Sequence, residues 1–116
     1  MFDCYLRSRC IGEIWKRIFS NLTIGDNVVL NGNNYLDLSA TVILEKGVSL
    51  GSRIIIMSHN WYNGNKFLQE RFSHTCGYQD DLIKEGAGVI AGAVIVMGVT
   101  IGGNAVIGAR PFRLPS

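Results

Sequence analysis

Aliphatic residues recur at every sixth position over most of this chain. Every position in the pattern is Ile, Leu or Val, and the series are Ile24, Leu30 and Leu36; Leu44, Leu50 and Ile56; and Ile83, Val89, Ile95, Ile101 and Ile107. An amphipathic helix places apolar residues at i+3, i+4 and i+7, and a strand in a flat sheet alternates strictly, so neither explains this spacing. A period of six instead predicts a short strand followed by a corner. Three such sides close one triangular coil, with the aliphatic residue pointing inward.

Small or polar residues follow many of these aliphatic positions, and we interpret them as corners. Gly25, Asn31, Gly51 and Gly102 each come directly after one, and Gly and Asn tolerate the backbone angles that tight corners need. Successive coils are expected to stack at the inter-strand spacing of ~4.8 Å, with backbone groups paired between them. The pattern therefore predicts an all-β fold, a parallel β-helix built as a solenoid, and a single domain over 1–116.

The six-residue spacing is interrupted in two places. Leu44 comes eight positions after Leu36, at the end of the stretch LDLSATVI (36–43), which predicts one side of a coil with a two-residue bulge. Between Ile56 and Ile83 the register is lost for more than twenty residues. An insertion leaves a stacked coil at a corner and often forms the binding face. A protruding loop is therefore expected at about 60–82.

The first 22 residues lack the repeat and show a helical pattern instead. The apolar positions with helical spacing are Ile11, Ile14, Trp15, Ile18, Phe19 and Leu22. Charged residues lie mostly between them, as in an amphipathic helix. Terminal repeats of a solenoid need a cap, so 1–22 is expected to form an N-terminal helical cap and 23–116 the β-helix. A helix on a membrane surface is the less favoured alternative, because its polar face is only weakly basic.

Composition and charge exclude several classes of protein. The 116 residues include 14 glycines and 2 prolines, which is typical of a chain with many turns. A net charge of +2 supplies no basic stripe for nucleic acid, and no apolar run approaches the ~20 residues that span a bilayer. The three cysteines Cys4, Cys10 and Cys76 are scattered, which fits a reducing compartment rather than a disulfide framework. A cytoplasmic protein is expected.

Three stretches carry a resemblance to a known family: IGDNVV (24–29), SLGSRI (49–54) and GVTIGGNAVIGA (98–109). They resemble the left-handed parallel β-helix acyltransferases of the hexapeptide-repeat superfamily. The bulged side and the aliphatic run ending at His59 are similar to those of maltose/galactoside and capsular or lipopolysaccharide O-acetyltransferases. The resemblance implies a left-handed coil, a homotrimer, and transfer of an acetyl group from acetyl-CoA to the hydroxyl of a sugar or saccharide.

The chain departs from the family pattern in two places. Ser58 and Trp61 stand where the family has an Asp and a second His beside the catalytic histidine. After Ala109 the family continues through more of the last coil and a closing segment, whereas this chain gives RPFRLPS. The C-terminal end is therefore expected to be truncated relative to the family.

The same resemblance implies candidate site residues. His59, at the base of the loop, matches the general base, and Asn31 of the NGN stretch matches a substrate-binding Asn. In the family, coenzyme contacts come from the last coils, and the expected contacts here are Ala91, Gly92, Gly108, Ala109 and Arg110.

General chemistry is consistent with a histidine as the base. Imidazole takes up a proton near neutrality, so it can accept the proton of a hydroxyl as that oxygen attacks a thioester. A thiol is a good leaving group, so no metal is expected. His59 and His74 are also too few for a three-histidine metal site. His74 lies inside the loop and is expected to be a loop residue or a minor substrate contact.

Other loop residues have two interpretations. Trp61 and Tyr62 suit sugar binding, and they equally suit packing of the loop against a neighbouring subunit. Asp80 and Asp81 are expected in a solvated return of the loop. The alternatives to a sugar O-acetyltransferase are a catalytically impaired trimeric scaffold or binding module, and an N-acetyltransferase or antibiotic-modifying acetyltransferase of the same fold.

Overall fold

The computed structural model describes residues 4–7 and 20–108, and most of these form short parallel strands in three sheets. Sheet A contains β1 (Cys4–Arg7), β4 (Asn34–Asp37), β7 (Ile55–Ile56) and β12 (Val94–Ile95). Sheet B contains β2 (Leu22–Ile24), β5 (Val42–Leu44), β10 (Asp81–Ile83) and β13 (Thr100–Ile101). Sheet C contains β3 (Val29–Leu30), β6 (Ser49–Leu50), β11 (Gly88–Val89) and β14 (Val106–Ile107).

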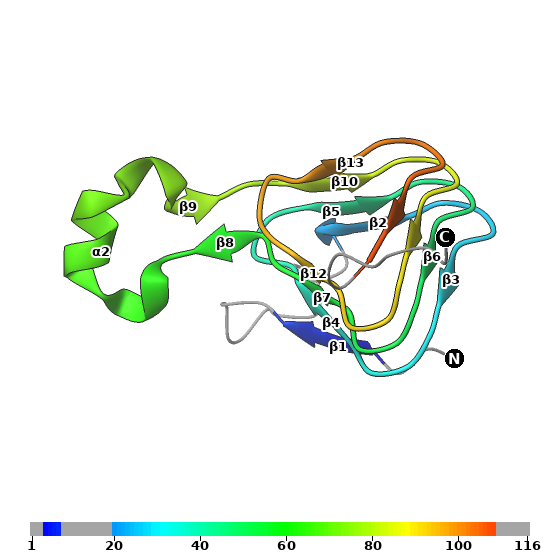
Figure 1. Ribbon diagram of the computed structural model, residues 1–116, viewed down its shortest axis with the longest axis horizontal. Helices are drawn as coiled ribbons and strands as arrows, with labels where there is room; N and C mark the ends of the chain where they lie inside the picture. The colour runs from blue at the N-terminus through cyan, green and yellow to red at the C-terminus, as the bar shows by residue number, and fades with distance from the viewer. Residues whose placement is uncertain (1–3, 8–19, 109–116) are drawn as a thin grey trace, which may run out of the picture.

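The chain passes through sheets B, C and A in that order and then repeats the circuit, which gives the triangular outline in Figure 1. Each strand pairs in parallel with the strand one circuit later, so that Leu36 on β4 faces Ile56 on β7, and Ile56 faces Ile95 on β12. The inner strands β6, β7 and β11 are only two residues long, and each pairs with a strand on both sides. The prediction of an all-β chain built from parallel sheets is confirmed.

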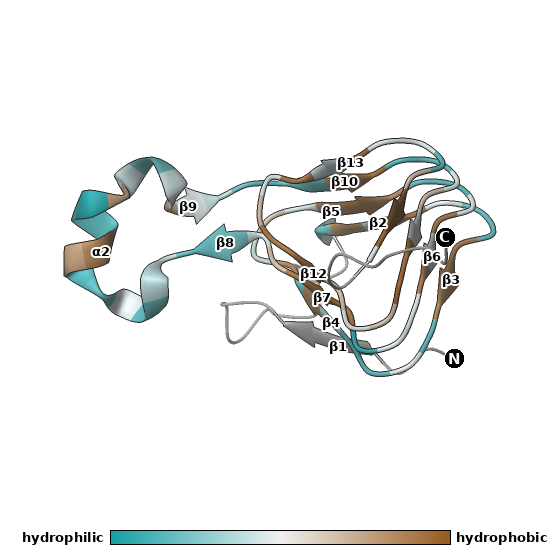
Figure 2. Ribbon diagram, in the orientation of Figure 1, coloured by the Kyte–Doolittle hydropathy of each residue, from teal (hydrophilic) through white to brown (hydrophobic). Residues whose placement is uncertain are grey.

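The aliphatic residues at six-residue spacing fill the inside of the coil. Leu36, Leu50 and Ile56 are completely buried, and Ile95 and Ile101 are nearly so. Figure 2 shows the hydrophobic colour concentrated on the strands, with polar residues at the corners. Ile24 is 41% exposed, because β2 pairs only with β5 and lies at one edge of sheet B.

Residues 59–78, which we name the arm, leave the coil between sheets A and B (Figure 1). Its base is the antiparallel pair β8 (His59–Asn60) and β9 (Gly77–Tyr78), in which His59 faces Tyr78. Beyond it lie 3₁₀ turns at Tyr62–Gly64 and Ser73–Thr75 and the helix α2 (Lys66–Arg71). The side chain of Asn65 caps α2 by accepting a hydrogen bond from the Leu68 N–H at 3.1 Å. The arm projects from the coil at the position of the expected loop.

The predicted helical cap, 1–22, lies mainly in 8–19, outside the described residues. Near its N-terminal end Cys4–Arg7 forms the strand β1, and near its C-terminal end Ser20 is helical and Leu22 begins β2. Strand β1 pairs in parallel with β4, with Cys4 opposite Asn34 and Arg7 opposite Asp37. Residues 4–7 therefore extend sheet A by one strand, which the helical pattern did not indicate.

Adjacent isoleucines on β7 provide a test of this fold, because Ile56 is completely buried and Ile55 is 38% exposed. Replacing Ile56 with Ala removes core contacts and leaves a cavity, so it is expected to lower the free energy of unfolding by about 2–5 kcal/mol. Ile55→Ala makes the same chemical change on the outer face and is expected to cost less than about 1 kcal/mol. Urea unfolding of both variants measures the difference, and equal losses would contradict the assignment of inner and outer faces.

Candidate functional site

The candidate site lies at the corner between sheets A and B, where three successive coils differ in local structure. In the first coil the corner contains Asp37 and the bulge after it. In the second the chain leaves to form the arm, beginning at His59. In the third the chain turns at Val96 and Met97 between β12 and β13. Because the strands of sheet A are parallel, these three segments are stacked at the same end of the sheet.

The imidazole of His59 is paired with a buried carboxylate. Its Nδ1 contacts Oδ2 of Asp37, and the side chain of His59 is 28% exposed whereas that of Asp37 is 1% exposed. The other oxygen of Asp37, Oδ1, accepts hydrogen bonds from the N–H of Ser39 at 3.2 Å and from its hydroxyl at 2.7 Å. The groups of Ser39 and Ser58 that bond to this carboxyl all donate to it, so the carboxyl acts as an acceptor.

Ser58 fixes the relative positions of these two coils. Its N–H donates to Oδ2 of Asp37 at 3.0 Å, and its hydroxyl donates to the carbonyl oxygen of Asp37 at 2.6 Å. The same hydroxyl accepts a hydrogen bond from the N–H of Ala40 at 2.8 Å. Ser58 is completely buried. It therefore joins the bulge of the first coil to the residue immediately before His59.

This arrangement determines which ring nitrogen of His59 is available. Because Asp37 accepts hydrogen bonds, Nδ1 of His59 is the nitrogen that donates, and the neutral ring then has an unprotonated Nε2. A carboxylate on Nδ1 also stabilises the charged ring once Nε2 has taken a proton. The pair is therefore built to accept a proton at Nε2.

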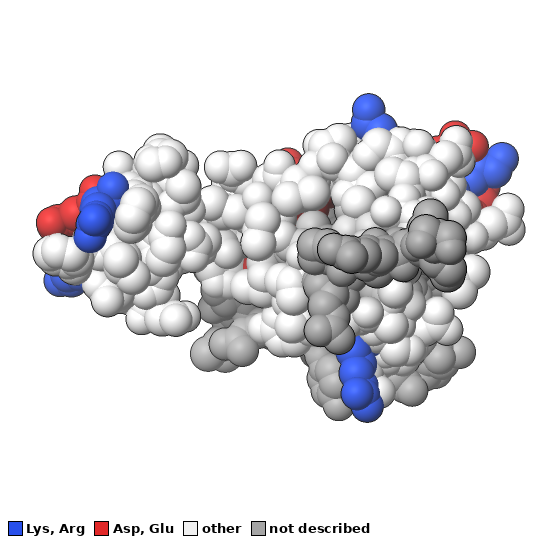
Figure 3. Space-filling model, in the orientation of Figure 1, with Lys and Arg blue, Asp and Glu red and all other residues white. Residues whose placement is uncertain are grey.

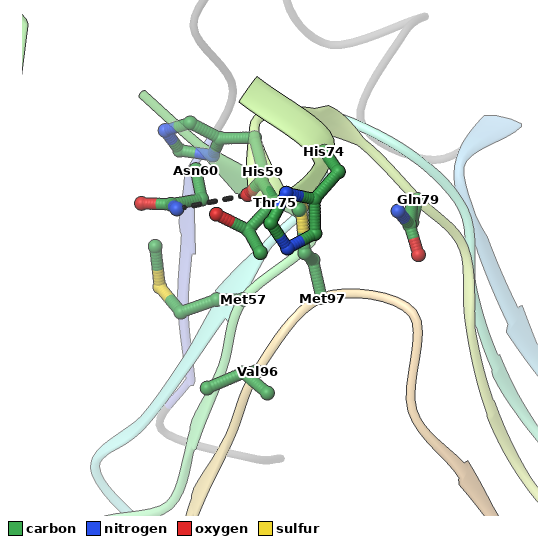
Figure 4. A pocket seen from close by; sticks show the side chains of 8 residues that line it. All are labelled: Met57, His59, Asn60, His74, Thr75, Gln79, Val96 and Met97. Carbon is green, nitrogen blue, oxygen red and sulfur yellow. Dashed lines mark hydrogen bonds between the residues drawn. The ribbon is translucent and has the colours of Figure 1, made fainter. Parts of the chain in front are cut away.

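A cavity of about 500 Å³ lies beside His59, between the base of the arm and the third coil (Figure 4). Figure 4 shows Met57 and Val96 on the side of the coil and the side chains of Asn60, His74 and Thr75 gathered toward the arm, whereas Gln79 lies apart from them. The residues that line this cavity are Met57, His59, Asn60, His74, Thr75, Gln79, Val96 and Met97. None of them is an Asp, Glu, Lys or Arg. The cavity thus combines apolar walls with neutral polar groups.

Two of the polar lining residues are occupied by bonds within the arm. Asn60 donates to the carbonyl of Thr75 at 3.0 Å, the bond drawn in Figure 4, and accepts from the N–H of Tyr62 at 3.2 Å. The hydroxyl of Thr75 donates to the carbonyl of Phe72 at 2.8 Å. These bonds set the shape of the cavity wall. His74, expected only as a loop residue or minor contact, lines the same cavity as His59.

A second carboxylate, Asp81, is also buried near this corner, which corrects its expected place in a solvated return of the loop. Its Oδ1 accepts a hydrogen bond from the Val99 N–H at 3.0 Å, whereas its Oδ2 has no partner among the described residues. Burial raises the pKa of Asp81 from 3.8 to about 7, against the opposing effect of backbone hydrogen bonds, and the charges of Asp37 and Asp80 add to the rise. Asp81 therefore remains largely protonated up to neutral pH.

The structure places Asn31 away from His59 within one chain. Asn31 precedes β4 and His59 follows β7, so they lie at opposite ends of sheet A. The side chain of Asn31 donates to the carbonyl of Leu50 at 3.0 Å, which is a link between coils. This contact is the one expected of a corner residue.

The two aromatic residues expected to bind substrate do not line the cavity. Trp61 is 42% exposed and packs edge-on against Tyr78, with ring centroids 5.7 Å apart. The Tyr62 hydroxyl contacts the Thr75 hydroxyl, and its ring lies 6.1 Å from that of Phe72. Both contacts lie within 59–78, so these rings pack the arm on itself.

The expected coenzyme contacts fall in two groups. Ala91 and Gly92 are exposed at the corner between sheets C and A, at the end of sheet A opposite to His59. Gly108 follows β14 and is the last described residue, and Ala109 and Arg110 lie outside the described residues. Within one chain, the structure therefore does not bring Ala91 and Gly92 to the cavity beside His59.

Asp37 and Ser58 are site residues that the sequence pattern did not identify as such. A carboxylate inside the apolar stretch Leu36–Leu38 was one available signal, because a buried charge usually has a partner. The second was the length of the coil: Leu36 pairs with Ile56, so Asp37 must lie beside Met57 and Ser58. Counting the two bulge residues into the coil length would have placed Asp37 next to His59.

Comparison with protein-family models, with curated proteins and with solved structures finds no match for this chain. Within 4–7 and 20–108, no group of three or more His, Cys, Asp or Glu side chains is placed to hold a metal ion. Over the same residues, no helix has the length and apolar character needed to cross a membrane.

The buried Asp81 leads to a prediction about stability and pH. In the unfolded chain this carboxyl ionises near pH 4, whereas the folded protein retains its proton to about pH 7. Its contribution to stability is therefore complete at low pH and is lost as the pH rises through 7. Wild type is expected to lose about 2–3 kcal/mol more than Asp81→Asn between pH 5 and pH 8. Urea unfolding at both pH values measures this, and parallel losses in the two proteins would contradict it.

Proposed function

We propose that this chain is an acetyl-CoA-dependent O-acetyltransferase that acts on a hydroxyl of a sugar or saccharide, with His59 as general base. The observation that carries the proposal is the contact of buried Asp37 with Nδ1 of His59, beside a cavity of about 500 Å³. The resemblance of the repeats to hexapeptide acyltransferases supplies the donor and the class of acceptor.

The proposed reaction uses Nε2 of His59. As the acceptor oxygen forms a bond to the carbonyl carbon of the thioester, its proton moves to Nε2, and Asp37 stabilises the resulting imidazolium. The tetrahedral intermediate then collapses, the carbon–sulfur bond breaks, and the proton on Nε2 passes to the departing sulfur. His59 returns to its neutral form, and neither a metal nor a covalent enzyme intermediate is needed.

The cavity lining supports this chemistry in two respects. Met57, Val96 and Met97 give an apolar wall that suits an alkyl thioester. No Asp, Glu, Lys or Arg lines the cavity, which favours a neutral hydroxyl over a charged acceptor. The family pattern has an Asp directly before the histidine, where this chain has Ser58, and here the carboxylate that contacts the histidine is Asp37 of the preceding coil.

The proposal includes a left-handed coil and a trimer. Ile55 and Val94, which lie on the outer face of sheet A, are 38% and 58% exposed, and Val29 and Val106 on sheet C are 52% and 63% exposed. Apolar outer faces of this kind favour association with other copies. Association also offers a way to bring Asn31, Ala91 and Gly92 of one subunit toward His59 of another.

Acetyl transfer is tested by thiol release from acetyl-CoA in the presence of neutral sugars, amino sugars and aminated antibiotics. A neutral sugar is expected to be acetylated on oxygen. His59→Ala is expected to lower kcat/KM by about 10²–10⁴-fold, because the proton acceptor is lost. Asp37→Asn is expected to lower it in the same direction, because an amide does not stabilise the imidazolium.

Phe67→Ala is the control for these variants, since Phe67 is 70% exposed on α2 and does not line the cavity. Its kcat/KM is expected to equal that of wild type. Full activity in His59→Ala would show that the base is wrongly assigned. No thiol release with any acceptor would contradict the enzymatic proposal and favour a scaffold or binding module, and transfer only to amines would favour an N-acetyltransferase.

A further inference from the structure

His74 lines the cavity beside His59 but has no part in the proposed proton transfer. It belongs to the 3₁₀ turn Ser73–Thr75 of the arm, whereas the apolar wall of the cavity comes from the coil. Figure 4 shows the imidazole of His74 pointing from the arm toward Met97 of the third coil. The cavity therefore holds two imidazoles, one from the base of the arm and one from the turn farther along it.

The ring of His74 is not engaged by the rest of the arm. Asn60 and Thr75, the other polar residues close to His59, are bonded within the arm, and Gln79 lies apart from them in Figure 4. Within 4–7 and 20–108, the side chain of His74 makes no hydrogen bond, ion pair or ring contact. A neutral imidazole has one nitrogen that donates and one that accepts, and both are available to a ligand here.

The turn that carries His74 is fixed to the base of the arm. The Asn60 amide donates to the carbonyl of Thr75 at 3.0 Å, and the Tyr62 hydroxyl contacts the Thr75 hydroxyl. Tyr62 has a φ of 48°, in the left-handed region that a bulky residue rarely adopts. Residues kept in such conformations cluster at sites that bind ligands. These contacts hold the residue directly after His74 and so limit where the ring of His74 can point.

The surroundings of His74 favour a neutral ligand. The charged residues Lys66, Glu70 and Arg71 lie on α2, where all three are exposed. Figure 3 shows the charged atoms of the arm at its outer end, and an almost uncharged surface where the arm joins the coil. The cavity has no Asp, Glu, Lys or Arg in its lining. A hydroxyl both donates and accepts, so it matches the two nitrogens of the ring.

We propose that His74 binds a second hydroxyl of the acceptor, so that the enzyme selects polyhydroxylated rings over simple alcohols. The proposed function places the reacting hydroxyl at Nε2 of His59, and the role of His74 rests on that placement. A saccharide has further hydroxyls beside the reacting one, and its C–H groups suit the apolar wall of the coil. At about 500 Å³ the cavity is in the size range of small-molecule sites. His74 is thus an acceptor-binding residue that determines specificity.

The kinetic test compares acceptors that share a six-membered ring and differ in hydroxyls: methyl β-D-glucoside, methyl β-D-galactoside, and cyclohexylmethanol, which has a single hydroxyl. His74→Phe keeps a flat ring and removes both nitrogens. With the glycoside that wild type acetylates, this variant is expected to raise KM about tenfold and to change kcat little, because a hydrogen bond made before and during the reaction is lost. With cyclohexylmethanol its kinetics are expected to equal those of wild type.

Two further variants separate a direct contact from an effect on the fold. His74→Gln retains a donor and an acceptor, so it is expected to recover part of the lost affinity. Ser73→Ala changes the exposed neighbour of His74, which does not line the cavity, and is expected to match wild type with every acceptor. Both positions are exposed, so all three variants are expected to melt at the wild-type temperature.

A binding measurement keeps the role of His74 separable from acetyl transfer. In protein with ¹⁵N-labelled histidine and without acetyl-CoA, titration with at least one of the two glycosides is expected to shift the ring resonances of His74. Cyclohexylmethanol is expected to leave them unchanged. If no acceptor is acetylated, the proposed function fails, and this titration still shows whether His74 binds a polyhydroxylated ring.

Three results would overturn the proposal. The first is no shift of the His74 ring with either glycoside. The second is an equal loss in His74→Phe with the glycosides and with cyclohexylmethanol. The third is a lower kcat in His74→Phe at unchanged KM, which would show that His74 acts on the transition state instead of on acceptor binding.

Discussion

Hydrogen bonding between successive coils is the constraint on which the rest of this structure depends. Many backbone groups on the sides and corners pair with the equivalent group one coil away, as Asp81 N–H does with the carbonyl of Thr41 at 2.9 Å. Position within the coil therefore decides which residues meet, whatever their separation in sequence. Asp37 and His59 are brought together in this way. The arm leaves the coil at the same corner, where an insertion does not interrupt the pairing of the strands.

Much of the coil was predictable because an inward-facing residue has few alternatives. Leu36, Leu44 and Leu50 were assigned to the interior from their spacing, and each is completely buried. Strand β1 was not predictable, since its pairing with β4 lies outside the repeat. Spacing alone also does not indicate which strands lie at the edges of the sheets. Ile24 is exposed because its strand, β2, lies at one edge of sheet B.

The candidate site was only partly predictable. His59 stood out because an aliphatic run ended where the repeat was interrupted. Asp37 did not, because its role depends on contact between coils and not on any local motif. Asp81 was misassigned for a related reason: its neighbour Asp80 is exposed, as the loop composition indicated, but the side chain of the next residue turns inward at the start of β10.

The two buried carboxylates near this corner differ in their hydrogen-bond partners. Asp37 is surrounded by donors from Ser39, Ser58 and His59, which offset the cost of burying a charge. Asp81 has one oxygen without a partner among the described residues, and burial keeps it protonated to about pH 7. The corner thus holds one charged carboxylate against His59 and avoids a second.

The most direct measurement of this account is nitrogen NMR of the His59 ring in ¹⁵N-labelled protein, at a pH where the ring is neutral. Pairing of Nδ1 with Asp37 predicts that the proton resides on Nδ1, that it exchanges slowly with solvent, and that Nε2 is unprotonated. Asp37→Asn is expected to abolish this preference. A neutral ring with its proton on Nε2 would contradict the proposed base and the site built around it.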